Sequence, residues 1–527
     1  MRSFNLTVSE VFKRSMGWVH TWLGLIFGSL LFAIFWMGTL SVFDKEIDQW
    51  MKPEMRLPFI QSRPSIDAQL EKLEHDIEQN SPIVVRLPKP RIPVLQIAYI
   101  NRAGTVEDLV INPIEQSVLQ PTNTLAASGF FFPFHYALNL KWRSVGIWIV
   151  GLATMAMLIL LVSGTLIHRK LIVDFFTFRR RRSQRRSVLD LHNLAGTIGL
   201  PFYFILALTG LIILFDSYLH WSATLLFDGD SSALNEQLIG FPKVQVSGNS
   251  LVQTASVDKM VAQAESTWNR RSRERQFADL VMISIQGDAN SLVDVRQIFP
   301  SRNVIRHRTA LIFDRSTGAL VHDYSCQPLA CAYGWLIGSH FIQFDHQTLR
   351  WLYFVGGLLG CVMIATGSLF WIVSRLKKRS EDSEINGVVR AMTVSSITGI
   401  ILATCSFLIA NRLLSKEASF WIFDRAVLEV LSFFFAWVVS YFHAAIRGPK
   451  AWSDQTSAIA CLAFITPVLN WVTTGDTMLK TLSTPHLYNI AGVDVCLLIG
   501  AAIAAWAAYI LNGKFNIGLS EPVTTQH

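Results

Sequence analysis

The chain has 527 residues, of which 51% are hydrophobic and 16% are charged, and its formal net charge is +8. This composition argues against a soluble multidomain enzyme and favours a membrane protein. The positive charge is gathered in short basic segments next to apolar stretches, so it requires no nucleic acid partner.

Apolar segments long enough to cross a hydrocarbon core of about 30 Å recur along the chain. Eight are predicted, at 18–43, 145–168, 191–215, 350–374, 391–414, 420–443, 456–473 and 489–511. The first is predicted as a retained helix rather than a signal peptide, because its apolar run is too long and no A-x-A site follows. The fold class is therefore an integral membrane protein, mainly α-helical, with eight transmembrane helices.

Basic residues predict the orientation of these helices. They lie in segment 2–14, in the loop 168–186 with its eight Lys and Arg, after the fourth and sixth apolar segments, and at Lys514. All five positions fall on one side of an even-numbered topology, and short basic loops stay cytoplasmic. We expect both termini to be cytoplasmic and the long loops 44–143 and 216–348 to face the opposite side of the membrane.

Each long loop has the pattern of a small α/β module. A helical stretch at 65–80 precedes alternating runs at 94–119, and a second at 256–268 precedes runs at 278–299 and 310–324. In the second loop, Cys326 and Cys331 fit a disulfide in an oxidising compartment, with free thiols as the alternative. The chain contains no C-x-x-C-H motif, so a covalent c-type haem is not expected.

The first and third apolar segments share a histidine followed by the same residues at offsets of 4, 18 and 24. The two sets are His20, Gly24, Gly38 and Asp44, and His192, Gly196, Gly210 and Asp216. Small residues let helices pack closely in lipid, but packing gives no reason for a repeated histidine. Residues 1–178 and 187–379 are therefore predicted to be two copies in the same orientation, and 390–527 form four further helices outside the repeat.

The second and fourth segments also correspond. His135 and His340 each precede one of them, and the small-Gly pairs Ser163-Gly164 and Thr366-Gly367 stand near their far ends. Aromatic runs surround both histidines, at 130–136 and 332–341. These runs are interpreted as interfacial belts, or alternatively as a surface that holds a haem edge or docks a metal chelate.

Taken together, these motifs resemble the PepSY-associated transmembrane-helix family over about residues 1–379. Inner-membrane members of that family include haem-containing ferric-siderophore reductases. The resemblance implies a location in the bacterial inner membrane, two PepSY-like periplasmic modules in the loops 44–143 and 216–348, and a ferric siderophore as the electron acceptor. The second segment departs from the family pattern, because "TLIHRK" replaces the aromatic-rich end seen in "SLFWIV" of the fourth.

Two facing imidazoles can hold one haem iron between apolar helices. The repeat and the resemblance predict His20 with His192 at an inner haem and His135 with His340 at an outer one, giving two non-covalent b-type haems. A lone histidine at a helix end is more often an interfacial residue with its polar tip in water. The less favoured ligands, which lack a repeat partner, are His168, His220, His346 and His443.

The predicted function is a di-haem reductase that passes electrons across the membrane to a ferric siderophore. One alternative is a siderophore or iron transporter, which would need polar residues at the midplane of its helices. Asp424 and Glu429 in the sixth segment are the candidates: if deeply buried they could serve a proton or quinol site, but Asp424 lies near the helix start and is expected at the interface. The other alternative is a non-catalytic PepSY sensor or protease-modulating protein. No nucleotide-binding G-x-G-x-x-G is found in a cytoplasmic segment, so a quinol or a separate reductase is the expected donor.

Overall fold

The computed structural model describes residues 10–60, 64–78, 81–167, 184–218, 255–272, 275–286, 290–297, 309–324, 328–375 and 383–518. The chain divides into two compact units, each built from separate stretches of sequence. The first, here called the membrane unit, comprises Met1–Met51, Asn123–Leu214 and Leu352–His527. The second, here called the sheet unit, comprises Lys52–Thr122 and Phe215–Trp351.

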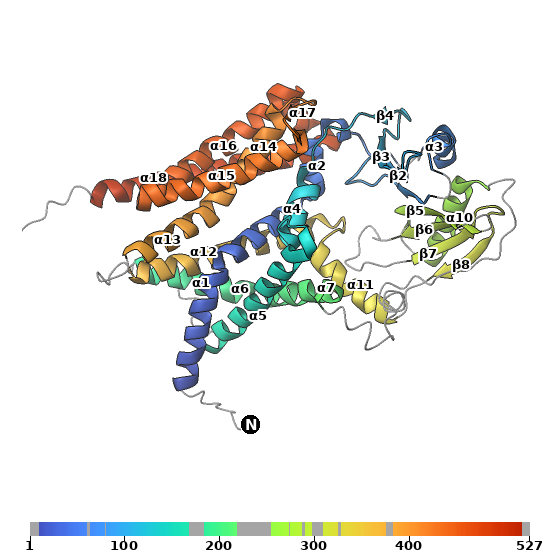
Figure 1. Ribbon diagram of the computed structural model, residues 1–527. Helices are drawn as coiled ribbons and strands as arrows, with labels where there is room; N and C mark the ends of the chain where they lie inside the picture. The colour runs from blue at the N-terminus through green and yellow to red at the C-terminus, as the bar shows by residue number, and fades with distance from the viewer. Residues whose placement is uncertain are drawn as a thin grey trace, which may run out of the picture. The chain divides into compact units, whose positions relative to one another are not determined.

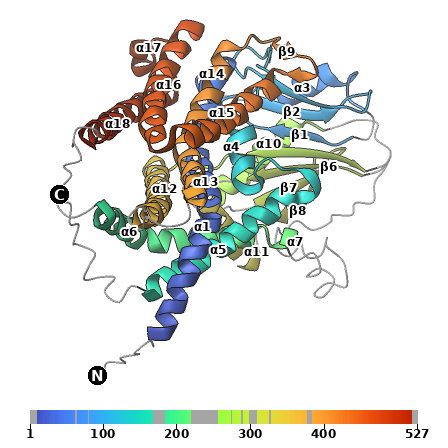
Figure 2. The same cartoon turned by 60° about the vertical axis from the view of Figure 1, so that its left-hand side comes forward.

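The membrane unit is helical (Figures 1 and 2). Its longer helices are α1 (Glu10–Ser41), α4 (Ala126–Ala137), α5 (Val145–Ile167), α6 (Gln184–Ile213), α12 (Gln347–Arg375), α13 (Ser383–Val394), α14 (Ile400–Leu413), α15 (Arg425–Arg447), α16 (Ala451–Thr474) and α18 (Tyr488–Gly518). Shorter elements are α2 (Asp44–Met51), η2 (Trp142–Ser144), the π-helix η4 (Ser395–Gly399), η5 (Gly448–Lys450), α17 (Met478–Ser483), η6 (Pro485–Leu487) and the strands β9 (Ser419–Phe420) and β10 (Phe423–Asp424).

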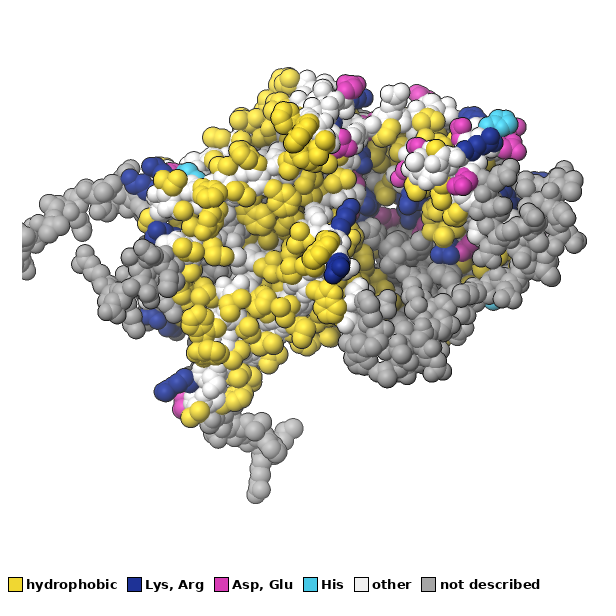
Figure 3. Space-filling model, viewed as in Figure 1, with side chains coloured by type: hydrophobic (Ala, Val, Ile, Leu, Met, Phe, Trp, Pro, Cys, Tyr) yellow, Lys and Arg dark blue, Asp and Glu magenta, His cyan; other side chains and the backbone are white. Residues whose placement is uncertain are grey.

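Within the described residues, seven helical stretches are long and apolar enough to cross a membrane. One of them, Arg425–Thr474, contains both α15 and α16. The chain turns between these helices at Gly448, whose φ of +61° suits glycine. Apolar side chains cover the visible face of the helices (Figure 3), and Phe435 and Ile446 on α15 are largely exposed. Such a surface suits contact with lipid, and the chain is a multi-pass membrane protein.

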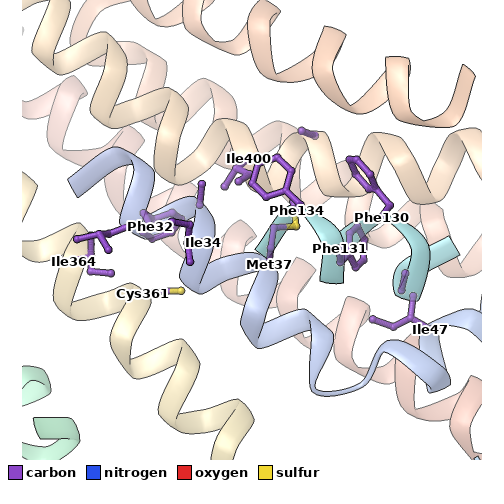
Figure 4. Close-up of a cluster of buried hydrophobic side chains, with 14 of the residues drawn as sticks. Phe32, Ile34, Met37, Ile47, Phe130, Phe131, Phe134, Cys361, Ile364 and Ile400 are labelled. Atoms are coloured by element: carbon purple, nitrogen blue, oxygen red, sulfur yellow. The ribbon is translucent and has the colours of Figure 1, made fainter. Parts of the chain in front are cut away.

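The core of the membrane unit lies where α4 meets α1, α14 and α15. Phe130, Phe131 and Phe134 of α4 are buried beside Met37 of α1 and Ile400 of α14 (Figure 4). Ring contacts extend this cluster into α14 and α15: Phe130 lies 4.8 Å from Phe407 and 5.1 Å from Phe433, measured between ring centroids. The helices after residue 383 thus share one core with those before it.

The sheet unit contains one eight-stranded antiparallel sheet in the order β4-β3-β2-β1-β5-β6-β7-β8 (Figure 1). The strands are β1 (Ile83–Arg86), β2 (Leu95–Ile100), β3 (Val106–Ile111), β4 (Val118–Leu119), β5 (Leu280–Gln286), β6 (Asn290–Gln297), β7 (Thr309–Asp314) and β8 (Leu320–Tyr324). Strand β1 pairs with β5 in the register Ile83↔Ile283 and Arg86↔Leu280. This pairing joins the strands of the two long loops into a single sheet.

Helices α3 (Ile66–Leu73) and α10 (Val257–Arg271) pack on this sheet and share its core with alternate strand residues such as Val85, Ile97 and Val293. Strands were expected at β2–β8 and helices at α3 and α10, and these expectations are confirmed; β1 was not foreseen. The other helices among the described residues of this unit are η1 (Pro53–Met55), α7 (Phe215–Tyr218) and α11 (Pro328–Phe341).

The N-termini of α3 and α10 cap each other. The Asp67 carboxylate accepts hydrogen bonds from the Ser256 hydroxyl at 2.5 Å and the Val257 backbone N–H at 2.8 Å. The Asp258 carboxylate accepts the equivalent bonds from the Ser65 hydroxyl at 2.6 Å and the Ile66 N–H at 2.8 Å. Each carboxylate therefore satisfies free N–H groups of the other helix, where negative charge is also favourable.

Candidate functional site

His20 of α1 and His192 of α6 lie together in the membrane unit. Their ring centroids are 6.3 Å apart and the ring planes meet at 75°. Both imidazoles are partly buried. The structure therefore brings together two residues that are 172 positions apart and that the sequence repeat had paired.

The same kind of contact holds each imidazole. His20 Nδ1 lies 3.1 Å from the Leu160 carbonyl oxygen of α5, and His192 Nδ1 lies 2.8 Å from the Met363 carbonyl oxygen of α12. With the proton on Nδ1, each ring donates to that carbonyl and its Nε2 carries the lone pair. A backbone carbonyl at Nδ1 is the usual device that fixes the tautomer and orientation of a metal-binding histidine.

Small residues make the space for the two rings. A Cβ at Gly164 would lie 3.1 Å from His20 Cε1, and a Cβ at Gly367 would lie 3.1 Å from His192 Cε1. The Ser163 hydroxyl, next to Gly164, lies 3.1 Å from His20 Nδ1. The imidazoles thus pack against the two small-Gly pairs identified in the sequence, Ser163-Gly164 and Thr366-Gly367.

The glycines that follow the two histidines face the same anchoring residues. A Cβ at Gly24 would lie 3.8 Å from Leu160 Cδ2, and a Cβ at Gly196 would lie 3.4 Å from Met363 Sδ. Because these residues supply the carbonyls at Nδ1, the close approach of the helices and the histidine contact occur at one crossing. Sequence reasoning missed Leu160 and Met363, although each stands three residues before the hydroxyl residue of its small-Gly pair.

His135 lies on α4 and is held in a related way. Its Nδ1 is 2.9 Å from the Ile34 carbonyl oxygen of α1, and a Cβ at Gly38 would lie only 2.6 Å from the same nitrogen. Ile34 is fourteen residues beyond His20 on α1, a rise of about 21 Å along the helix. The two histidine sites along α1 are therefore well separated in depth.

The predicted outer pair is divided between the two units. His135 belongs to the membrane unit, whereas His340, near the end of α11, belongs to the sheet unit. Of the two predicted disulfide cysteines, Cys331 is disulfide-bonded and Cys326 lies outside the described residues.

Of the four less favoured histidines, the two that the structure describes make different contacts from those of His20 and His192. His346 Nδ1 lies 3.3 Å from the Leu349 backbone N–H and caps the start of α12. His443 Nδ1 lies 3.3 Å from Gln455 Nε2, and its Nε2 is 3.7 Å from Asp454. His168 and His220 lie outside the described residues.

The interpretation of the aromatic run 130–136 as an interfacial belt or docking surface is wrong for three of its four phenylalanines. Phe130, Phe131 and Phe134 are at most 2% exposed. They are buried because α4 packs against α14 and α15, helices that the repeat did not include. In the second run, Trp335 is half exposed.

The two acids of the sixth apolar segment also differ from each other. Glu429 is fully buried and lies 2.7 Å from Arg425 Nη1 and 2.9 Å from Asn411 Nδ2, and the Thr124 hydroxyl donates to its other oxygen. Asp424 is exposed and caps α15 through the Val427 N–H at 2.9 Å. Glu429 therefore links α15 to α14 and to the segment before α4 through its side-chain contacts.

Comparison with known proteins adds the family. The family model for the PepSY-associated TM region matches residues 17–374, which include all four paired histidines. An uncharacterized protein of Pseudomonas aeruginosa is 26% identical over 289 residues, which cover 51% of this chain and 69% of that protein. Helices α13 to α18 lie beyond the family match.

Proposed function

Because the chain belongs to the family of PepSY-associated transmembrane regions, we propose that it is a b-type haem reductase of the bacterial inner membrane that passes electrons to a ferric siderophore. Reduction would loosen the chelate, because Fe²⁺ is a softer ion of lower charge that hard oxygen ligands hold less strongly. The electron donor in this proposal is a quinol or a separate reductase.

The observation that carries the proposal is the His20–His192 pair. The ring centroids of the two imidazoles are 6.3 Å apart, and each ring is held at Nδ1 by a backbone carbonyl. With the protons on Nδ1, each ring would offer its Nε2 lone pair, and the two rings together would hold one haem iron between α1 and α6. Neutral imidazoles fixed in this way are a donor set that fits haem.

The histidines and their neighbours would have distinct roles. His20 and His192 would hold an inner haem, and His135 with His340 an outer one, both without covalent attachment. A bound haem supplies one-electron chemistry that no side chain offers. Leu160, Met363 and Ile34 would orient the ligands, while Gly164, Gly367 and Gly38 keep the space beside each ring open.

The proposal includes the topology. We assign eight crossings, because Arg425–Thr474 is far longer than the roughly 20 residues that one crossing needs and turns at Gly448. Basic residues then place both termini in the cytoplasm and the sheet unit in the periplasm. The matched contacts of His20 with α5 and of His192 with α12 support two copies within 1–178 and 187–379.

A visible absorption spectrum of the purified full-length protein tests the function. We expect the bands of low-spin haem b and, by pyridine haemochrome assay, two haems per chain. His192→Ala should lose about one of them, while the matched control His443→Ala keeps both. A purified, folded protein without a haem band would overturn the proposal.

A further inference from the structure

The connection between α14 and α15 is a small hairpin with an apolar tip. Strands β9 and β10 pair in the register Phe423↔Phe420 and leave Trp421 and Ile422 as the loop. Phe420 is 70% exposed, Trp421 88% and Ile422 76%. Three consecutive large apolar side chains thus project from the protein.

The residues at the tip of the hairpin differ from those that two-residue turns usually contain. Trp421 has a φ of +59°, a conformation that Gly, Asn and Asp adopt at lower cost in two-residue hairpin loops. The loop thus carries a bulky indole at a position where its backbone is strained. Local folding preference does not account for tryptophan here, so its use must lie in what the side chain contacts.

The base of the hairpin is fixed to the membrane unit. Asn123 Nδ2 donates to the Asp424 carboxylate at 3.1 Å, and Arg425 Nη1 donates to the Asn123 carbonyl at 3.0 Å. Arg425 is also paired with the buried Glu429. The apolar tip is therefore held outward from a rigid base.

The surface around the hairpin continues the lipid-facing surface. Leu413, the last residue of α14, and Leu431 and Phe435 of α15 are exposed apolar residues. The helices α15 and α16 cross in succession, so α17, which follows α16, lies at the same end of the bundle as the hairpin. There Leu479 is 80% and Leu482 53% exposed.

We infer that the β9–β10 hairpin is a membrane anchor whose tip, Phe420 to Ile422, inserts into the interfacial layer of the lipid leaflet at this end of the helices. Indole suits that layer, because its ring is apolar and its N–H can reach water or headgroups. The ligand is bulk phospholipid, and the inference holds with or without a haem in the protein.

Site-directed spin labelling in phospholipid vesicles tests the inference. The exposed free cysteines Cys461 and Cys496 are replaced by alanine in the full chain, and a nitroxide is attached at Trp421→Cys. Phe435→Cys on α15 serves as the lipid reference, and Val106→Cys, 74% exposed at the start of β3, as the water reference. Oxygen and a water-soluble nickel chelate then compete to relax each label.

We expect the label at position 421 to be relaxed by oxygen and protected from nickel, as at position 435. Relaxation by nickel to the extent seen at position 106 would overturn the inference. Protection from both reagents with an immobilised spectrum would also overturn it, since the tip would then pack against protein. If Trp421→Cys does not fold, Ile422→Cys gives the same readout from the neighbouring position.

Discussion

At the scale of single residues, the positions of the histidine rings depend on neighbouring glycines, which have no Cβ. Gly164, Gly367 and Gly38 each leave room that a Cβ would take from a histidine ring. The sequence displays these glycines and their equal spacing, so their importance could be predicted. It does not display which ring they face, because the partner lies on a helix more than 90 residues away in the chain.

Gly164→Val should displace the His20 ring. Its Cβ would already lie 3.1 Å from Cε1, and the two added methyl groups would push the imidazole away from the Leu160 carbonyl. We expect the low-spin signal of the inner haem to be lost, which is about half of the total. Gly17→Val is the matched control on α1, because a Cβ there meets nothing within 4 Å. Equal haem content and spectra in both variants would contradict this assignment of the inner site.

Asp314, in the turn between β7 and β8, gives the sheet unit a pH-dependent contribution to stability. Its carboxylate accepts bonds from the Ser316 hydroxyl at 2.5 Å and from the Ser316 and Thr317 N–H groups, and the first of these is the largest cause of its lowered pKa. A carboxylate whose pKa is depressed on folding stabilises above its unfolded pKa of about 3.9 and loses that stabilisation as the pH falls through the folded value.

Asp314→Ala should therefore lower the protection of residues 309–324 from hydrogen exchange at pH 7 by an amount equivalent to about 1 kcal/mol. The difference from the unaltered protein should shrink below about pH 4, once intrinsic exchange rates are corrected for. Asp108→Ala is the control, since its pair with Arg86 is exposed and 3.9 Å long and is worth little. A difference that persists unchanged at pH 3 would refute the role of the carboxylate.

At the scale of elements, the sequence predicted most segments but not their partners. The alternation of β2 and β3 and the apolar runs of the long helices are visible in the chain, whereas β1 is four residues long and too short to show a period. The burial of α4 against α14 and α15 was also missed. Contacts such as Phe130 with Phe433 join positions 303 apart, and hydrophobic periodicity shows only that a face is apolar, never what covers it.

Glu429→Ala should strongly destabilise this α4–α14–α15 junction. It would leave the Arg425 guanidinium buried without its carboxylate, which typically costs about 3–5 kcal/mol. Glu429→Gln should cost less, because an amide can still bond to Thr124 and Asn411. Thermal unfolding in detergent measures both, with Asp424→Ala as a control worth about 1 kcal/mol for a lost helix cap. If Glu429→Ala unfolds no earlier than Asp424→Ala, the junction does not depend on this ion pair.

At the scale of the whole molecule, residue spacing predicts a repeat, but it does not predict how the two copies would assemble. Equal offsets from His20 and His192 indicated two copies, yet nothing in the spacing indicated that the strands of both loops would share one sheet through β1 and β5. The spacing also placed His135 and His340 together, and these residues belong to different units. The structure also places the His135 ring against Ile34 of α1, fourteen residues beyond His20. The two histidine sites are therefore separated by about 21 Å along this helix.

This separation predicts that both histidine sites are needed to transfer electrons across the membrane. His20→Ala and His135→Ala should each lose about one haem of two, with different remaining spectra, because each removes a ligand at a different depth. Neither variant should reduce a ferric chelate held outside vesicles when the reductant is inside, since electron tunnelling falls steeply with distance and one site alone leaves most of the bilayer uncrossed. Two control variants, His346→Ala and His443→Ala, should keep both haems and the activity. His346 caps the start of α12, and His443 contacts Gln455. Vesicles in which either single-site variant still reduced the external chelate at the unaltered rate would show that the two sites do not act in series.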